Sequence, residues 1–338
     1  MVSQGLSTVK ALEIAQMPRS TYYYKSNGQR KGKAPSRYTL YNGRKVGNAD
    51  VVKTINGILE QEFIDYGYHR TTEALKNMGY QINHKKVYRL MKENKLLFKP
   101  FKKNITDKVF VKYNTPMCKR VFETLEIDIK YIYIHGLKKN AYLITLMDVF
   151  SRAALVWRID TNMKADQVVA LVNELNDSYL IPLEIDKGAL KIKIRSDNGS
   201  QFIAKIFRNI LDNLHIENEY IKPATPQQNG HIESFHNTIN RLVTNHYYFD
   251  DLDEARTVFS RFYNTYNNKR IMKSILNKTP MDFIKTWARN VIETKKINGE
   301  IKYFFREKPP QIVEDPSSEI GYLQNKINDN FNVFLNHY

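Results

Sequence analysis

The sequence predicts an α/β domain built on a mixed sheet and preceded by an all-α region. Between residues 124 and 220, short apolar stretches of strand length are interspersed with two amphipathic stretches of helix length. From 50 to 98, apolar residues recur at the spacing of a helix face instead. Some of these strands follow one another directly, and others are separated by helices. This order is typical of a mixed sheet that is covered by helices.

Composition narrows the classes of protein to which this chain can belong. Its 338 residues leave room for two or more domains, and 42 % hydrophobic residues suffice for a buried core. The single cysteine, Cys118, excludes an intramolecular disulfide and any zinc site that needs several cysteines. The longest apolar run, 141–150, is about half of a membrane span. We therefore expect a soluble, cytoplasmic protein without a membrane partner.

The positive charge is concentrated in the first third of the chain. Residues 1–122 contain 24 Lys and Arg but 8 Asp and Glu, and so carry almost all of the net charge of +17. A concentrated positive field suits a polyanion, most often a nucleic acid. The alternative is a merely basic soluble protein.

The all-α region ends in a short helix, a glycine turn and a basic helix. The stretch "TTEALKNMG" ends at Gly79, and "NHKKVYRLMKENKLL" follows with Asn83 as its N-cap. This order resembles a helix-turn-helix, although an ordinary three-helix domain with a solvated basic face has the same pattern. The candidate DNA contacts lie on the basic side of the second helix: Lys85, Lys86, Arg89 and Lys92.

Five strands and three helices are expected after residue 119. The strands come from "FETLEIDIKYIYI", "AYLITLMDVFSR", "AALVWRID", "KIKIRSD" and "IENEYIK". The helices come from "KADQVVALVNELNDSYL", from 201–213 and from "HIESFHNTINRLVTNHYY". The last helix has an apolar stripe made of Ile232, Phe235, Ile239, Leu242 and Val243.

Three carboxylates stand out by their positions in these elements. Asp128 lies on the polar face of the first strand, Asp197 ends the fourth strand, and Glu233 lies in the first turn of the last helix. Carboxylates held on rigid elements are the ligands that two Mg²⁺ ions require for phosphodiester chemistry. Each also has a structural alternative. Asp128 could form an ion pair with Lys130 or Lys193, Asp197 could be a turn residue, and Glu233 could favour the N-terminus of its helix.

Several motifs together resemble a known family. "EIDIKYI", "YLITLMDVFSR", "RSDNGSQF" and "PATPQQNGHIESFHNTINR" follow one another as in the DDE catalytic core of retroviral integrases and insertion-sequence transposases. "YNTYNNKRIMKSILNKTPMDF" and "YGYHRTTEALKNMGYQINHKKVYRLMKENKL" resemble segments of the OrfB-type transposases of the insertion-sequence three family. The resemblance implies an RNase H-like catalytic core in which Asp128, Asp197 and Glu233 hold two Mg²⁺ ions, with Mn²⁺ as a substitute.

The resemblance also assigns roles to residues around the triad. Asn198 and Gln201 would shape the loop beside Asp197, and Gln228 and Asn229 would lead to Glu233. Asp148 matches a non-catalytic position and would be structural, with Arg152 as a candidate partner. Many relatives have Lys or Arg where this chain has Asn240, so that either the contacts to the DNA end differ here or Arg241 beside it takes over. The implied DNA contacts in this core are therefore Asn198, Gln201, Gln228, Asn229, Asn237 and Arg241.

By the same resemblance, the protein would cut transposon ends and join the freed 3′-hydroxyl to target DNA. Its partners would be double-stranded terminal inverted repeats, target DNA and further copies of itself, with an upstream-frame OrfA-type product as a candidate partner. It would associate with the nucleoid. A DNA-binding regulator with an unused core and an RNase H-like nuclease that does not join strands are the rival functions.

The patterns and the resemblance together divide the chain into five expected segments. They are an N-terminal helical arm with a basic linker (1–48), a helix-turn-helix domain (49–98), a linker (99–118), the catalytic core (119–285) and a C-terminal tail without an assigned role (286–338).

Overall fold

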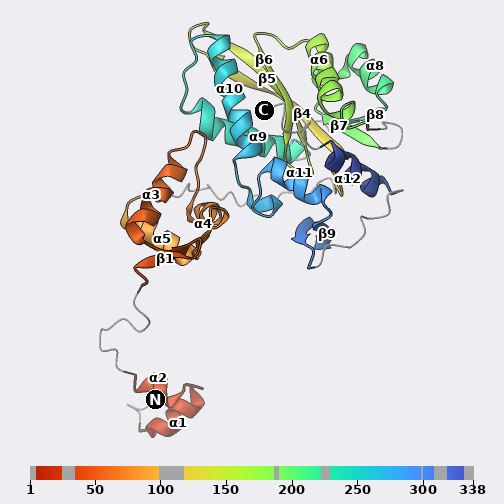
Figure 1. The fold of residues 1–338 in the computed structure, drawn as a ribbon. Coiled ribbons are helices and arrows are strands. Elements are labelled where there is room, and N and C mark those ends of the chain that lie inside the picture. The colour runs from red at the N-terminus through yellow and green to blue at the C-terminus, as the bar shows by residue number, and fades with distance from the viewer. Residues whose placement is uncertain are drawn as a thin grey trace. The chain divides into compact units, whose positions relative to one another are not determined.

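The computed structural model describes residues 5–24, 35–98, 118–185, 190–221, 229–297, 300–307 and 318–330. It consists of two compact units, Met1–Tyr38 and Thr39–Tyr338. The first unit contains the short helices α1 (Thr8–Ile14) and α2 (Arg19–Tyr22), and the Ser7 side chain caps α1 by accepting from Lys10 N. All elements described below belong to the second unit, apart from the first residue of β1 (Figure 1).

Three helices form the domain that precedes the core. They are α3 (Asn48–Leu59), α4 (Tyr68–Asn77) and α5 (His84–Glu93). Asn83 is the N-cap of α5, as predicted, and its Oδ1 accepts from Lys86 N at 2.9 Å. The apolar faces of the helices meet in one buried cluster around Val51, Leu75 and Val87, and Ile271 from the core also belongs to this cluster.

A β-hairpin lies where the sequence predicts part of a linker. Strands β1 (Tyr38–Tyr41) and β2 (Arg44–Gly47) form a sheet with the two-residue strand β3 (Tyr80–Gln81), in the order β2-β1-β3. The linker assignment is therefore wrong for 38–47. Asn42 and Gly43 have φ values of 45° and 80°, which is the turn that Asn-Gly favours in two-residue hairpins. The predicted linker 99–118 lies almost wholly outside the described residues.

The core contains the predicted mixed sheet. Its strands are β4 (Thr124–Ile134), β5 (Lys139–Asp148), β6 (Ala154–Asp160), β7 (Ile192–Ser196) and β8 (Ile216–Tyr220). The order is β6-β5-β4-β7-β8, with β4, β5 and β6 antiparallel and β7 and β8 parallel to β4. This arrangement confirms the α/β fold class, and it places the central strand β4 beside β7.

Helices cover both faces of this sheet (Figure 1). One group is α6 (Ala165–Leu175), its π-helical extension Asn176–Leu180, α7 (Ser200–Ile203) and α8 (Lys205–Asn213). The other is α9 (Gly230–Ile239), its π-helical extension η4 (Asn240–Thr244) and α10 (Leu252–Asn268).

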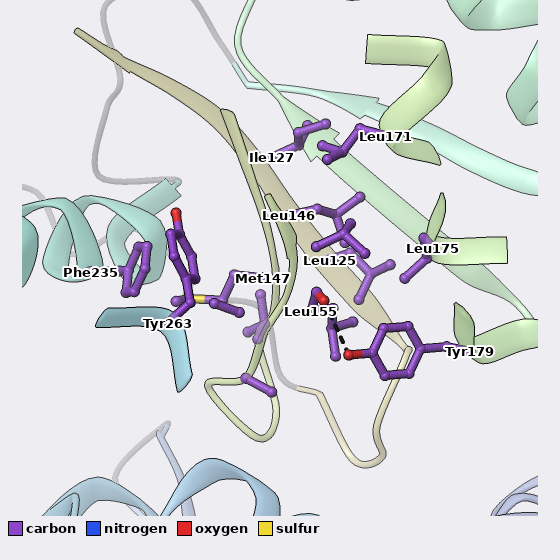
Figure 2. Packing of buried hydrophobic residues seen from close by; sticks show 14 of the residues in the cluster. Leu125, Ile127, Leu146, Met147, Leu155, Leu171, Leu175, Tyr179, Phe235 and Tyr263 are labelled. Carbon is purple, nitrogen blue, oxygen red and sulfur yellow. Dashed lines mark hydrogen bonds between the residues drawn. The ribbon is translucent and has the colours of Figure 1, made fainter. Parts of the chain in front are cut away.

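Successive residues of one strand contact the two helix layers. Leu146 faces Leu171 and Leu175, whereas its neighbour Met147 faces Phe235 and Tyr263 (Figure 2). This alternation follows from the pleat of a strand, whose side chains point to opposite faces in turn. Both faces are apolar at this point, which explains why the β5 sequence is an almost continuous hydrophobic run.

The chain after residue 285 adds further elements to the core. Helix α11 (Pro280–Ala288) leads into a hairpin of β9 (Ile292–Ile297) and β10 (Glu300–Phe305), and α12 (Glu319–Asp329) follows. Leu323 and Ile327 of α12 are buried in the main hydrophobic cluster. The Tyr303 hydroxyl donates to Phe150 O at 3.1 Å. Among the described helices, none is long and apolar enough to cross a membrane.

Candidate active site and nucleic-acid interface

The sheet register brings the first two predicted carboxylates together. Strands β4 and β7 pair in parallel, with Thr124 opposite Lys193 and Glu126 opposite Arg195. Continued for two more residues, the same register places Asp128 beside Asp197, just after β7 ends. Neighbouring strands lie about 4.8 Å apart, so both carboxylates lie at one point of the sheet.

The third predicted carboxylate lies on the helix that packs against β4. The backbone N–H of Ile232, in the first turn of α9, donates to Glu126 Oε2 at 2.8 Å. Glu233 is the next residue. Burial, together with the charges of Asp197 and Glu233, raises the pKa of Asp128 to about 6. Asp197 and Glu233 are therefore both within electrostatic reach of Asp128.

Asp128 has two polar neighbours. Its Oδ1 accepts from Ile129 N at 2.8 Å, and its Oδ2 lies 3.5 Å from His236 Nδ1. Burial, followed by the charge of Lys130, lowers the pKa of His236 to about 3, so this ring is neutral at physiological pH and does not form an ion pair. Lys193, an alternative partner considered for Asp128, pairs with Glu217 at 3.4 Å instead.

The loop after β7 holds Asp197 by backbone geometry. Asp197 Oδ1 accepts from Gly199 N at 2.9 Å. A Cβ on Gly199 would lie 2.9 Å from Asp197 Oδ1 and 2.5 Å from Gln201 Nε2, so a larger residue here would displace these side chains. The Asn198 side chain donates to Ile221 O at 2.9 Å and thereby ties the loop to the end of β8. Asn198 thus has a structural partner, and Gln201 is half-buried in the same loop.

The donor set at this point fits a hard divalent cation. Carboxylate oxygens are the ligands that Mg²⁺ prefers, and the mutual repulsion that raises the pKa of Asp128 is relieved when a cation binds. Among the described residues, no three His, Cys, Asp or Glu side chains are already gathered closely enough to hold a metal ion. The strands and the helix therefore supply carboxylate donors of the kind that Mg²⁺ prefers.

Glu126 is a site residue that the sequence analysis missed. Its side chain is fully buried, and burial raises its pKa to about 7 despite the hydrogen bond from Ile232 N. This contact fixes the start of α9, and with it Glu233, against β4. The alternation that placed Asp128 on the polar face of β4 also places Glu126 there, so the strand pattern contained the signal.

Asp148 is structural rather than part of this site. It is fully buried and accepts from Phe122 N at 2.9 Å, from Ser151 N at 2.7 Å and from Ser151 Oγ at 2.6 Å. The hydrogen-bond partners of the Asp148 side chain are thus Phe122 and Ser151, and not the guanidinium of Arg152 that the sequence suggested. The carboxylate organises the turn between β5 and β6.

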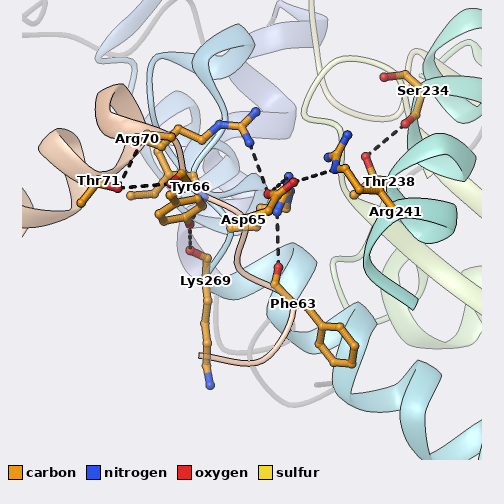
Figure 3. Close-up of polar contacts among 12 residues, drawn as sticks. Phe63, Asp65, Tyr66, Arg70, Thr71, Ser234, Thr238, Arg241 and Lys269 are labelled. Carbon is orange, nitrogen blue, oxygen red and sulfur yellow. Dashed lines mark hydrogen bonds and ion pairs between the residues drawn. The ribbon is translucent and has the colours of Figure 1, made fainter. Parts of the chain in front are cut away.

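Arg241 contacts a partner that the sequence did not predict. Its Nε lies 2.6 Å from Asp65 Oδ2, in the segment between α3 and α4 (Figure 3). Arg241 is exposed, but its side chain is paired with the segment between α3 and α4. Of the other predicted DNA contacts in the core, Asn237 is exposed, Asn229 is buried before α9, and Gln228 lies outside the described residues.

The basic side of α5 is only partly available to DNA. Lys85 and Lys92 are exposed and Lys86 is half-buried, whereas Arg89 pairs with Glu93 at 3.3 Å. An aromatic and histidine cluster that the sequence analysis missed lies at the start of this helix and at the start of α4. Its members are Tyr68, His69, His84 and Tyr88, with ring centroids 4.1 to 6.4 Å apart.

Family models match the two halves of this architecture. An integrase core domain model matches residues 119–226, and a second model of the same description matches 214–280. A model described as an HTH-like domain matches 47–104. The first two ranges contain all five strands of the sheet and the helices α9 and α10, and the third contains the helices α3 to α5.

Similar proteins come from insertion sequences and retroviruses. The InsK protein of insertion sequence element IS150 from Escherichia coli K12 is 25 % identical over 285 residues, which is 80 % of this chain and 91 % of that protein. A transposase for IS904 from Lactococcus lactis is 26 % identical, with 65 % and 87 % of the two chains covered. A simian T-cell lymphotropic virus intasome structure has a TM-score of 0.43 at 12 % identity, covering 69 % of this chain and 74 % of that one.

The domain matches and the relatives agree with the resemblance carried by the sequence motifs. The mixed sheet with helices on both faces is the RNase H-like fold of integrase and transposase cores. The helical domain before it is HTH-like. The chain therefore has an integrase core domain behind an HTH-like domain and is similar to transposases of insertion sequences, which is consistent with an OrfB-type transposase of the insertion-sequence three family.

Proposed function

We propose that this transposase cuts DNA at transposon ends and joins the freed strand to target DNA with Asp128, Asp197 and Glu233 as its metal-binding carboxylates. The observation that supports the proposal is that acidic side chains in the β7 loop and α9 lie within electrostatic reach of Asp128 on β4, where their charges add to burial in raising the pKa of Asp128. Relatives that act in DNA transposition and integration support the polynucleotidyl transfer class of reaction.

The residues of this chain would orient the reaction. Ile129 N fixes the Asp128 carboxylate, Gly199 N fixes that of Asp197, and Glu126 fixes the start of the helix that carries Glu233. Two Mg²⁺ ions, or Mn²⁺ in their place, would activate the attacking oxygen and stabilise the leaving oxygen of the phosphodiester. The carboxylates would hold the ions, and their positions on a sheet and a helix would limit movement.

Substrate binding would use both domains. The exposed lysines of α5 and the adjacent aromatic cluster would contact double-stranded terminal repeats, with phosphates bound by lysine and bases approached from the start of the helix. Two transposon ends must meet before joining, so the protein would act as a homo-oligomer on DNA.

The test uses amide substitutions that keep the shape of each side chain. Asp128→Asn, Asp197→Asn and Glu233→Gln should each lower strand transfer about 100-fold or more, since even residues that only orient metal ligands are worth 10- to 100-fold. Binding of terminal-repeat DNA without metal should be unchanged. Asp253→Asn, at a side chain that is 87 % exposed, is the matched control and should be fully active.

The products separate the rival functions. Joined strands would exclude a nuclease that only cuts, and metal-dependent cutting would exclude a regulator with an unused core. Near-normal joining by any one of the three variants would remove that residue from the proposed ligand set.

A further inference from the structure

A cavity of about 560 Å³ lies between the HTH-like domain and the start of the catalytic helix. Its walls come from α4, the β5–β6 turn, α9 with η4, and the chain after α10. Five of the side chains that line it are cationic: Arg70, Arg152, Arg241, Arg270 and Lys273. Among the described residues that line the cavity, none is an Asp or a Glu.

The charge at one wall of the cavity is only partly compensated. Asp65 Oδ1 lies 2.8 Å from Arg270 Nη2 and 3.8 Å from Arg70 Nη1, and its Oδ2 pairs with Arg241 (Figure 3). A single carboxylate thus faces three guanidinium groups. Burial, followed by the charge of Arg270, lowers the pKa of Arg70, which indicates crowded positive charge.

Two further cations form no ion pair in the described part of the chain, although the charges of Glu126 and Asp148 act on one of them, Arg152. Arg152 Nη1 is buried without a hydrogen-bond partner there. Lys273, in the 3-10 helix η5 (Lys273–Ile275), is exposed at the rim of the cavity. An anion in the cavity would therefore meet donors from several sides, and a phosphate group has the oxygen atoms to accept from them.

The cavity lies close to the catalytic carboxylates. Asn237, which lines it, follows Glu233 by one helical turn and so lies about 6 Å further along the axis of α9. Phosphates follow one another every 3.4 Å along the axis of a DNA strand. An anion in the cavity therefore lies within a few nucleotides of a phosphodiester bound at Glu233.

We propose that this cavity binds one backbone phosphate of the DNA strand that enters the active site. Arg70 of the HTH-like domain and Lys273 of the core would contact the same phosphate, so that the two domains hold one strand next to the scissile bond. The inference rests on the proposed function for its choice of ligand, but it concerns binding and not the chemical step.

The test measures DNA binding without metal, so that no cutting occurs. A labelled duplex with the terminal repeat of the element is titrated with wild type, Lys273→Gln and Arg70→Gln at several salt concentrations. Each variant should bind about tenfold more weakly, as expected for a lost hydrogen bond to a charged group. The slope of log affinity against log salt should also be shallower by about 0.9, which corresponds to one phosphate.

Lys269→Gln is the matched control. It removes the same charge four residues before Lys273, from an exposed side chain that is not part of the cavity wall and points away from Asp65 (Figure 3). It should leave the salt slope unchanged. If Lys269→Gln and Lys273→Gln lowered DNA affinity and the salt slope equally, the proposal would be overturned. Such a result would reflect the loss of one positive charge anywhere on the surface and not the loss of a specific phosphate contact.

A chemical change in the DNA identifies the contact itself. A series of duplexes carries one neutral methylphosphonate linkage each, at successive positions. One of these linkages, close to the scissile bond, should weaken DNA binding by wild type but not by Lys273→Gln or Arg70→Gln. Additive effects at every linkage would refute a shared phosphate. Joining activity by Asp128→Asn would refute the proposed chemistry while leaving these binding results as they are.

Discussion

Removal of the Asp65 carboxylate tests what holds the HTH-like domain against the core. Asp65 is 20 % exposed and pairs with Arg270, which is 4 % exposed, and with Arg241, which is 53 % exposed. Loss of one partner from a buried ion pair costs about 3–5 kcal/mol, because a charge is left uncompensated. An exposed pair contributes about 0–1 kcal/mol. Asp65→Ala should therefore destabilise the protein by about 3–5 kcal/mol, mostly through Arg270.

Glu62→Ala is the control for this prediction. Glu62 pairs with Arg261 at 3.0 Å and accepts from the Tyr247 hydroxyl, but Glu62 and Arg261 are 40 % and 47 % exposed. Its loss should cost about 1 kcal/mol or less. Urea unfolding followed by circular dichroism gives both values from the shift of the midpoint at constant slope.

A double variant shows whether the orphaned charge is the cause. Arg270→Met in the Asp65→Ala background removes that charge and should restore part of the stability, although the hydrogen bond from Arg270 to Phe63 O is lost as well. Similar costs for Asp65→Ala and Glu62→Ala, or a double variant that is several kcal/mol less stable than Asp65→Ala, would refute the reasoning.

Three further predictions concern other buried groups. Glu126→Ala should lower strand transfer about 10- to 100-fold, because α9 loses the hydrogen bond that fixes its start. Glu126→Gln should keep most of the activity, because its amide oxygen still accepts from Ile232 N. Equal losses in the two variants would contradict this prediction. Burial raises the pKa of Asp148 to about 6 in the folded protein, so its contribution to stability is full below about pH 4 and is lost as the pH rises through 6. The free energy of unfolding of wild type, measured from urea midpoints, should therefore fall by up to about 3 kcal/mol relative to that of Asp148→Asn between pH 4 and pH 7. A difference between the two proteins that does not change with pH would contradict the raised pKa. Burial also raises the pKa of the Cys118 thiol to about 12, so a chromogenic disulfide reagent at pH 8 should react only after unfolding.

Much of the fold could be predicted because its signals are local. Strand alternation defined β4 and β7, and the N-cap preference of Asn83 defined the start of α5. The first hairpin was also locally encoded, by Asn42 and Gly43, but the surrounding Gly- and Lys-rich composition favoured a linker assignment.

The parts that could not be predicted depend on contacts between distant segments. A helical projection correctly places Arg241 on the polar side of its helix, but its partner Asp65 is 176 positions away. Glu126 was passed over for a similar reason. A buried carboxylate in a strand has no assigned role until the N–H group that it accepts from is known, and Ile232 is 106 positions further on.

The dependence of the HTH-like domain on Ile271 has a consequence for the order of events on the ribosome. The Tyr66 hydroxyl donates to Lys269 O at 3.0 Å and accepts from Ile271 N at 2.8 Å, over 203 and 205 positions of the chain. At about 5–20 residues per second, the HTH-like domain leaves the ribosome about 10–40 s before these partners. During that interval its hydrophobic cluster lacks Ile271 and the Tyr66 hydroxyl lacks both partners. The nascent domain therefore reaches its final stability only when synthesis has passed the far end of α10.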